Sequence, residues 1–347
     1  MRDVLDELNG WIRDGVPVAM AVVVQTWGSS PRGVGAKMII CESGRIAGSV
    51  SGGCVEGAVV EIAMEVLGGK PPRLVSFGVS DDTAWDVGLA CGGMVEVFVD
   101  KVDPAFQSTI NELMGGSAAF AFGVIVNGPS SLLGGKVVVD NDGLVASSIS
   151  DTMNSEAVSA AASTLLDGKS AKINLLPEIE GAESVELFVE IIKPAPMLLI
   201  VGGVHIAVAL ARIARQLGYK TVVVDPRKAF GTVERFKDAD RLIQAWPEKA
   251  FEEIDINAAT AVTLLTHDPK IDDPAAMLAL ASPAFYIGAL GSRKTHRART
   301  ERLQKAGLRK EDLRRIHAPI GLDIGASSPE EIAVSIMAEI ISTQKLS

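Results

Sequence analysis

Cysteine is scarce in this sequence, which holds only Cys41, Cys54 and Cys91 among its 347 residues. None of them belongs to a Cys-x-x-Cys pair or lies close in sequence to a histidine. This spacing argues against a structural zinc site and against an iron–sulfur cluster held by cysteines. Few cysteines in a long chain are typical of a reducing compartment, so we expect a cytoplasmic protein.

Long apolar runs and an excess of basic residues are also missing. No stretch approaches the roughly 20 apolar residues that a helix needs to cross a bilayer. Residues 1–7 are typical of an amphipathic helix rather than a signal peptide. The 33 lysines and arginines are outnumbered by 43 aspartates and glutamates, which gives a net charge of −10. This balance argues against general binding to nucleic acid or to an anionic membrane.

The length and the order of the predicted elements indicate two domains, since one hydrophobic core rarely serves so long a chain. Residues 1–193 mix short strands and helices, in which we find no internal repeat. A proline-bearing connector at 193–196 is the expected boundary. Beyond it, short apolar strands alternate strictly with helices, which predicts a doubly wound parallel sheet. The expected fold is therefore an α+β domain over 1–193 and a Rossmann-like domain over 194–347.

The segment 48–57, Gly-Ser-Val-Ser-Gly-Gly-Cys-Val-Glu-Gly, holds the densest group of candidate site residues. Apolar residues at helical spacing follow it, so Cys54 should lie at or beside a helix start. Unpaired N–H groups and the positive end of the helix dipole favour anions and thiolates there. We therefore expect a turn that binds an acidic group and carries a reactive thiol. The alternative is a buried cysteine that packs as a small apolar residue.

A second segment, Cys91-Gly92-Gly93, mirrors the two glycines that precede Cys54. The two segments would then face one pocket. A structural, buried role is an equally good interpretation of Cys91, and we expect such a role for Cys41, which lies at a strand end.

The second domain opens with a strand, a glycine turn and a helix, the context of a dinucleotide-binding fingerprint. Asp225 follows Gly202 at the end of the second strand, where a ribose-binding acid belongs. Val204, however, occupies the position at which a second glycine would let pyrophosphate approach the backbone. This weakens the case for NAD(P). An NAD(P)-linked oxidoreductase with Cys54 or His267 as catalytic residue therefore stays the alternative function.

Two further strand ends of the predicted parallel sheet carry polar residues. His267 and Asp268 follow one strand and form either an acid–base pair or the cap of a helix. Ser292 and Arg293 follow another, at a glycine turn that begins a basic helix. Backbone donors and cations together would bind an anion there. The alternative is a solvated helix face formed by Arg293, Lys294, Arg297 and Arg299.

Taken together, these motifs resemble the XdhC/CoxI family, the xanthine dehydrogenase accessory or molybdenum cofactor insertion proteins. The resemblance is carried by 48–56, Cys91-Gly-Gly, Thr-His-Asp at 266–268, and the segments 287–293 and 319–325. Of the family pattern Gly-Ala-Gly-His-Val-Ala at 202–207, this chain keeps Gly202, His205 and Ala207. The resemblance implies an N-terminal XdhC/CoxI domain followed by a C-terminal Rossmann domain.

The resemblance also implies a function: a chaperone that holds the molybdenum cofactor (molybdopterin) rather than a turnover enzyme. Such a protein supports sulfuration of the cofactor with a cysteine desulfurase and delivers it to a molybdoenzyme of the xanthine dehydrogenase type. A third hypothesis is a pure assembly scaffold with Cys54 and Cys91 buried. We also consider a homodimer, because strands of the first domain would need a second layer to bury their apolar face.

The candidate residues follow from the motifs and the resemblance together. The expected cofactor-binding residues are Ser51, Gly52, Gly53, Cys54, Glu56, Cys91, Gly92, Gly93, Gly202, His205, Asp225, Ser292 and Arg293. Cys54 and Cys91 are the candidates for contact with molybdenum or sulfur. Should the protein turn over a substrate, the catalytic candidates are Cys54, His267 and Asp268.

Overall fold

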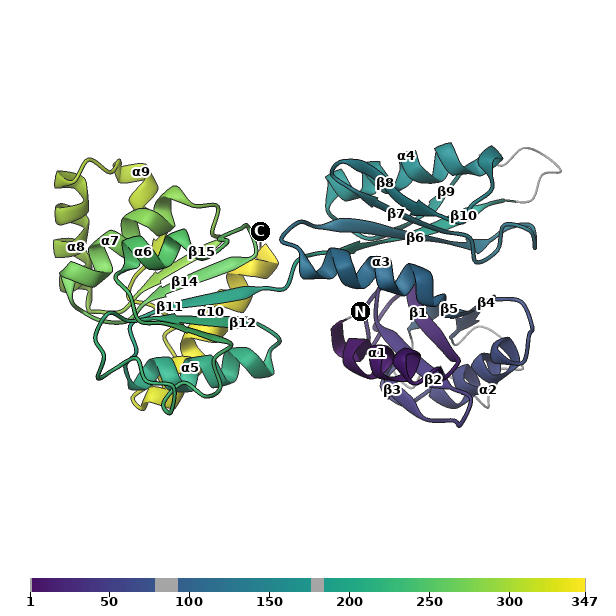
Figure 1. The fold of residues 1–347 in the computed structure, drawn as a ribbon, viewed down its shortest axis with the longest axis horizontal. Helices are drawn as coiled ribbons and strands as arrows, with labels where there is room; N and C mark the ends of the chain where they lie inside the picture. The colour runs from purple at the N-terminus through teal and green to yellow at the C-terminus, as the bar shows by residue number, and fades with distance from the viewer. Residues whose placement is uncertain (1, 79–92, 176–183, 347) are drawn as a thin grey trace. The chain divides into compact units, whose positions relative to one another are not determined.

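The computed structural model describes residues 2–78, 93–175 and 184–346 (Figure 1). Contacts divide the chain into two compact units, Met1–Lys193 and Pro194–Ser347, which are treated separately below. Two of the expected site residues, Cys91 and Gly92, lie outside the described residues.

The first unit contains two five-stranded antiparallel sheets. Sheet A has the order β3-β2-β1-β5-β4 and is built from β1 (Val18–Trp27), β2 (Lys37–Cys41), β3 (Ile46–Gly48), β4 (Arg73–Phe77) and β5 (Met94–Lys101). Sheet B has the order β8-β7-β6-β10-β9 and is built from β6 (Phe120–Asn127), β7 (Lys136–Asp140), β8 (Gly143–Ser147), β9 (Ala171–Asn174) and β10 (Glu186–Ile192).

Helices cover these sheets because each strand alternates its buried side chains between two apolar faces. The helices of the unit are η1 (Arg2–Val4), α1 (Leu5–Arg13), α2 (Glu56–Leu67), α3 (Pro104–Gly115) and α4 (Asp151–Asp167). Helix α2 packs on one face of sheet A and α4 on one face of sheet B. The opposite faces of the two sheets meet in a shared core that includes Val24, Phe98 and Phe188.

The two sheets of the first unit have the same strand order and the same connectivity. In each, three strands are followed by a helix and then by two more strands. The expectation of no internal repeat is therefore wrong. The repetition lies in strand order and register, and the two stretches share too few residue identities for it to be seen in the sequence.

The second unit is a parallel six-stranded sheet with the order β13-β12-β11-β14-β15-β16. Its strands are β11 (Met197–Val201), β12 (Lys220–Val224), β13 (Arg241–Ile243), β14 (Thr260–Leu264), β15 (Tyr286–Ala289) and β16 (Ile316–His317). Its helices are α5 (His205–Gln216), α6 (Pro247–Glu252), α7 (Pro269–Ala281), α8 (Arg293–Lys305), α9 (Lys310–Leu313) and α10 (Pro329–Leu346).

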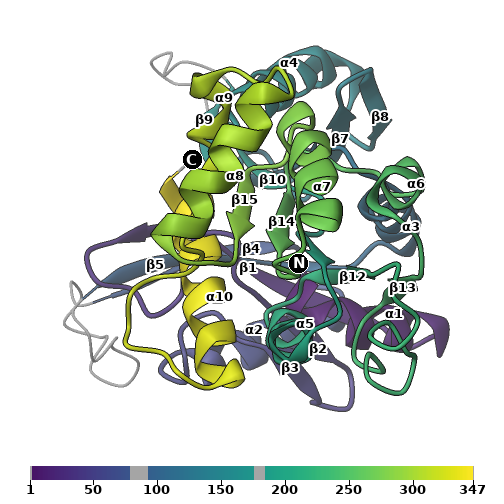
Figure 2. The same cartoon turned by 90° about the vertical axis from the view of Figure 1, so that its left-hand side faces the viewer.

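This sheet has an apolar core on each face, so its strands are buried on both sides. Helices α6, α7 and α8 contribute to one core, and α5 and α10 to the other (Figure 2). The predicted Rossmann-like, doubly wound parallel sheet is confirmed. Among the helices that the structure describes, none has the length and apolar character needed to cross a membrane.

Candidate functional site

The segment 49–55 forms a tight loop between β3 and α2. Gly48 introduces it with φ 76°, and a Cβ at this position would lie 2.3 Å from the backbone oxygen of Lys37. Glycine is therefore required where the chain leaves the sheet, because a side chain would meet both the backbone and an unfavourable φ.

The carboxylate of Glu56, the first residue of α2, turns back into this loop and organises it. Six donors reach its two oxygens at 2.5–3.3 Å, namely the N–H groups of Val50, Ser51, Gly52 and Gly53 and the hydroxyls of Ser49 and Ser51. Burial raises the pKa of Glu56, but the hydrogen bonds from Ser51 and Ser49 outweigh it and hold the pKa at about 2. The carboxylate is therefore ionised at neutral pH, and the loop amides that we expected to meet a ligand already bind an anion of their own chain.

The thiol of Cys54 faces solvent at the start of α2. The hydroxyl of Ser51 accepts hydrogen bonds from the N–H groups of Cys54 and Val55, each at 3.1 Å, and so fixes the turn that leads into the helix. Ser51 and Val55 are buried, whereas Cys54 is exposed. The interpretation of Cys54 as a buried apolar residue is therefore wrong, and so is a scaffold with this thiol inaccessible. Cys41 is buried, as we expected of a structural cysteine.

The segment 29–32, which follows β1, contacts both the Cys54 loop and the start of β5. A Cβ at Gly52 would lie 3.6 Å from Pro31, and Arg32 Nε donates to the carbonyl of Ser49 at 3.2 Å. A Cβ at Gly93 would lie 2.2 Å from the carbonyl oxygen of Ser29. Gly93 and the Cys54 loop thus share a neighbouring segment, while the approach of Cys91 to Cys54 stays a prediction.

Arg32 is a residue of this region that the sequence analysis missed. Besides holding Ser49, its guanidinium pairs with Asp3 at 3.0 Å. A single arginine within a Gly/Ser/Pro loop was the available signal, but it does not say which carbonyl the side chain reaches.

In the second unit, the carboxylate of Asp225 is occupied by its own chain. Asp225 is fully buried and accepts from the N–H of Gly203 at 2.6 Å and from Arg227 Nη2 and Nε at 2.7 and 2.9 Å. Burial raises its pKa, but the hydrogen bonds from Arg227 and Gly203 lower it below the ordinary value. Neither oxygen can accept from a ribose hydroxyl without competing with these donors.

The glycine turn itself is covered. A Cβ at Gly203 would lie 2.7 Å from the carbonyl oxygen of Phe230, because the segment after β12 folds back over the turn. The guanidinium of Arg227 lies 4.2 Å from the centre of the Phe230 ring. Val204 packs against the core beneath α5, and His205 is exposed at the start of that helix. A dinucleotide in the usual position would require this segment to move.

The turn after β14 places His267 and Asp268 differently. Asp268 is the N-cap of α7, and its side chain accepts from the N–H of Lys270 at 3.0 Å. His267 is exposed and has φ 62°, the single positive value among the described residues other than glycine. Such a φ is uncommon for a non-glycine residue and marks a constrained turn. The geometry of Asp268 matches the capping interpretation, and no hydrogen bond between the two side chains is found among the described residues.

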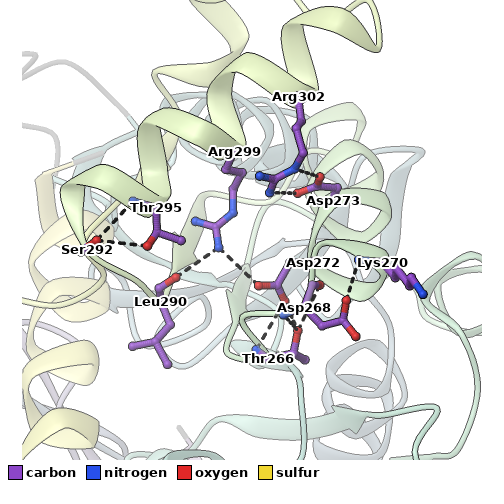
Figure 3. A network of polar contacts seen from close by, with 10 residues as sticks. All are labelled: Thr266, Asp268, Lys270, Asp272, Asp273, Leu290, Ser292, Thr295, Arg299 and Arg302. Atoms are coloured by element: carbon purple, nitrogen blue, oxygen red, sulfur yellow. Dashed lines mark hydrogen bonds and ion pairs between the residues drawn. The ribbon is translucent and has the colours of Figure 1, made fainter.

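Helix α8 carries both an exposed and a buried arginine, and Figure 3 shows the buried one, Arg299, pointing toward α7. Ser292 caps the helix by accepting from the N–H of Thr295 at 3.2 Å, and Arg293 is exposed. Arg299, on the same helix, is 2% exposed and reaches Asp272 on α7 at 3.3 Å. The alternative of a wholly solvated basic face is therefore wrong for Arg299.

A buried polar network joins the ends of β14 and β15 (Figure 3). Thr266 Oγ1 donates to Asp272 at 2.6 Å, and Arg299 Nη2 also donates to the carbonyl of Leu290 at 3.1 Å. Burial raises the pKa of Asp272 above its ordinary value despite these two neighbours. The network fixes the turn that carries His267 relative to the start of α8.

Within the described ranges, no group of three or more histidine, cysteine, aspartate or glutamate side chains is arranged to hold a metal ion. The described part of the chain has an exposed thiol at Cys54 and an exposed arginine, Arg293, at the α8 start.

Comparison with known proteins identifies the family. The family described as XdhC and CoxI matches residues 11–78, which include the Cys54 loop, and the XdhC Rossmann domain matches residues 198–340. A Bacillus subtilis (strain 168) protein, named as a probable subunit of xanthine dehydrogenase, is 30% identical over 343 residues, 97% of this chain and 96% of its own length. This chain belongs to the XdhC and CoxI family.

Two further proteins are similar to this chain over nearly its whole length, one in sequence and one in structure. The molybdenum cofactor insertion chaperone PaoD of Escherichia coli (strain K12) is 26% identical over 337 residues, 96% of this chain and 85% of PaoD. A crystal structure of a xanthine dehydrogenase from Bacillus halodurans superposes with a TM-score of 0.76 at 26% identity, covering 99% of this chain and 96% of that one. The family resemblance seen in the sequence is confirmed.

Proposed function

We propose that this protein binds the molybdenum cofactor and delivers it to a molybdoenzyme of the xanthine dehydrogenase type. It acts as a chaperone rather than as an enzyme with turnover. Relatives over nearly the full chain carry names from this area, a probable subunit of xanthine dehydrogenase and a molybdenum cofactor insertion chaperone. The observation that carries the proposal is the exposed Cys54 thiol at a helix start inside the XdhC and CoxI region.

The chemistry of Cys54 suits this cargo. A cysteine sulfur is a soft ligand that suits a metal bound to sulfur. Cys91 is the candidate for a second contact. Because Glu56 occupies the amides of residues 50–53, anionic groups of the cargo must find donors elsewhere. Ser292 and Arg293 of the second unit stay predicted anion-binding residues.

A binding experiment tests the proposal. Wild type and Cys54→Ala are incubated with a source of molybdenum cofactor and passed through gel filtration, and bound molybdenum and pterin are measured. The control is Ser155→Ala, an exposed position in the first turn of α4. We expect wild type and control to retain both signals and Cys54→Ala to lose most of them. Equal binding by Cys54→Ala would refute the role of the thiol, whereas absence of binding by wild type would refute the chaperone function.

The NAD(P)-linked alternative gains no support from the second unit. Gly203 and Arg227 already occupy Asp225, and Phe230 covers the glycine turn. Titration with NADH and NADPH is therefore expected to show no saturable binding at millimolar concentration. A cysteine desulfurase partner, support of cofactor sulfuration and a homodimer stay predictions from the sequence.

A further inference from the structure

The repeated topology of the first unit extends to individual backbone hydrogen bonds. In sheet A, Gly35 has φ 86° and donates to the carbonyl of Val23 at 2.8 Å. In sheet B, Gly134 has φ 80° and donates to Ile125 at 2.9 Å. Each glycine precedes the second strand of its sheet, so both sheets make the turn between their first two strands in the same way.

The register of the strands makes two lysines equivalent. Lys37 lies opposite Val22 in sheet A, and Lys136 lies opposite Val124 in sheet B. The fifth strands match too, since Asp100 lies opposite Met20 and Glu190 lies opposite Phe122. In each sheet the acidic residue and the lysine thus lie opposite first-strand residues that are two positions apart, Met20 and Val22 in sheet A, and Phe122 and Val124 in sheet B. The two carboxylates are therefore equivalent as well.

These equivalent residues pair reciprocally between the sheets. Lys37 forms an ion pair with Glu190, and Lys136 forms one with Asp100, each at 2.5 Å. Each sheet thus supplies its lysine to the carboxylate of the other, which is the pattern of an interface with twofold symmetry. Asn111 of α3 donates to Asn9 of α1 at 2.9 Å. These helices precede the first strand of their sheets, and each asparagine lies nine positions before the start of that strand.

The two copies differ at the helix that follows the third strand. Ser49 and Ser148 are still equivalent, because they donate to the carbonyls of Lys37 and Lys136 at 2.9 Å in both cases. In the second copy, Ser150 is the N-cap of α4, and Met153 of that helix is buried on sheet B. In the first copy the corresponding serine is Ser51 and the corresponding buried residue is Val55. Three residues, Gly52-Gly53-Cys54, separate these two, one more than the two residues between Ser150 and Met153.

The residue after the first buried position also differs in chemistry. Glu56 follows Val55 and accepts from six donors of the loop. Asn154 follows Met153, and its side-chain oxygen has no hydrogen-bond partner among the described residues. An equivalent serine thus precedes the helix in both copies, and only the first copy has the carboxylate that gathers the loop amides.

We infer that the first unit is an internal duplication, residues 3–102 and 103–192, whose copies have divided their roles. The first copy carries an added loop, and Glu56 is the positioning residue that holds Cys54 in place. The second copy is its structural partner. The fold requires the helix that follows the third strand but not Gly52-Gly53-Cys54. The identity of the ligand that Cys54 binds rests on the proposed function. The inference that the fold does not need residues 52–54 rests on the duplication alone.

Two variants of the full chain test this inference. In the first, residues 52–54 are replaced by Asp-Thr, the sequence at 151–152, and Glu56 by Asn, so that the first copy receives the second copy's helix start. We expect a folded protein with the gel-filtration volume and circular dichroism of wild type and with no retention of molybdenum cofactor. Loss of the folded state in this variant would overturn the separation of loop from fold.

The second variant, Glu56→Gln, tests the positioning role in a Cys91→Ser background, in which the exposed Cys54 reports thiol reactivity. The pseudo-first-order rate of reaction with Ellman's reagent is measured from pH 6 to 9. We expect a change of at least about threefold in rate, or a displaced pH profile, because the loop loses the acceptor that orders it. The control is Asn154→Ala, which should leave the rate unchanged. An unaltered profile in Glu56→Gln refutes the positioning role, and this readout does not depend on whether molybdenum cofactor binds.

Discussion

Replacing Glu56 by glutamine should destabilise the first unit and remove much of its sensitivity to acid. The pKa of Glu56 is lowered from 4.5 to about 2 in the folded protein. A pKa lowered by this amount corresponds to about 3 kcal/mol of folding free energy without solvent screening. Glutamine has nearly the same shape, but its amide group would face N–H donors in place of one carboxylate oxygen. Because Glu56 is partly exposed and solvent screens its charge, the expected loss at pH 7 is smaller, about 1–2 kcal/mol.

The sign of the pH effect follows from the direction of the pKa. Because the folded pKa lies below the unfolded one, the stabilisation is fully present above about pH 5 and is lost as the pH falls toward 2. Wild type should lose this contribution across that range, whereas Glu56→Gln should have a flatter profile.

Urea denaturation followed by circular dichroism and by tryptophan fluorescence measures both effects. Trp11 of α1 is 9% exposed in a core of the first unit, so its emission contributes a signal from that unit. The series is run at pH 7, 5, 4 and 3, with Glu156→Gln on the exposed face of α4 as the matched control. Equal midpoints for wild type and Glu56→Gln at pH 7, or parallel acid profiles, would refute the reasoning.

Three further substitutions probe the packing. Lys37→Met leaves Glu190 buried and unpaired and should lower the free energy of unfolding, measured by urea denaturation, by about 3–5 kcal/mol. The double variant with Glu190→Leu should recover most of this loss, and failure to recover it would contradict the reasoning. Arg299→Met leaves Asp272 unpaired and should lower the stability of the second unit by a similar amount of about 3–5 kcal/mol, so an unchanged thermal midpoint would count against the buried ion pair. Gly48→Ala places a Cβ 2.3 Å from a backbone oxygen at φ 76° and should lower the melting temperature, while a neutral result would show that the turn can relax.

The second unit could be predicted from the sequence because its strands are short, apolar and separated by helices. That pattern depends on local periodicity alone. The burial of Arg299 could not be predicted in the same way, since its neighbours on α8 are exposed cations. Its surroundings are set by Asp272, a residue of a different helix.

The candidate site was predicted in part. The helix start and the glycine turn follow from residue order, and so does the placement of Cys54 there. The direction of the Glu56 side chain does not, because a carboxylate in a first helical turn can point to solvent or back into the loop. The sequence analysis therefore expected an external anion where the protein supplies its own.

The internal repeat was missed for a related reason. The equivalent first strands read Val-Ala-Met-Ala-Val-Val-Val and Phe-Ala-Phe-Gly-Val-Ile-Val, which agree at only three of seven residues, all alanine or valine, although six of the seven positions have the same burial. Lys37 and Lys136 are equivalent residues of the second strands. Two lysines do not indicate a repeat in the sequence, because only the strand register shows that they are equivalent.

The reciprocal pairing of Lys37 with Glu190 and of Lys136 with Asp100 has a consequence for how this fold behaves on dilution. In an ordinary homodimer, such a symmetric interface comes apart as the protein concentration falls, and each protomer loses the support of its mate. Here both sides of the interface belong to one polypeptide, so their effective concentration is set by the chain itself and does not change with the number of molecules in solution. The half that bears Cys54 therefore keeps its support even when only a few copies of the protein are present.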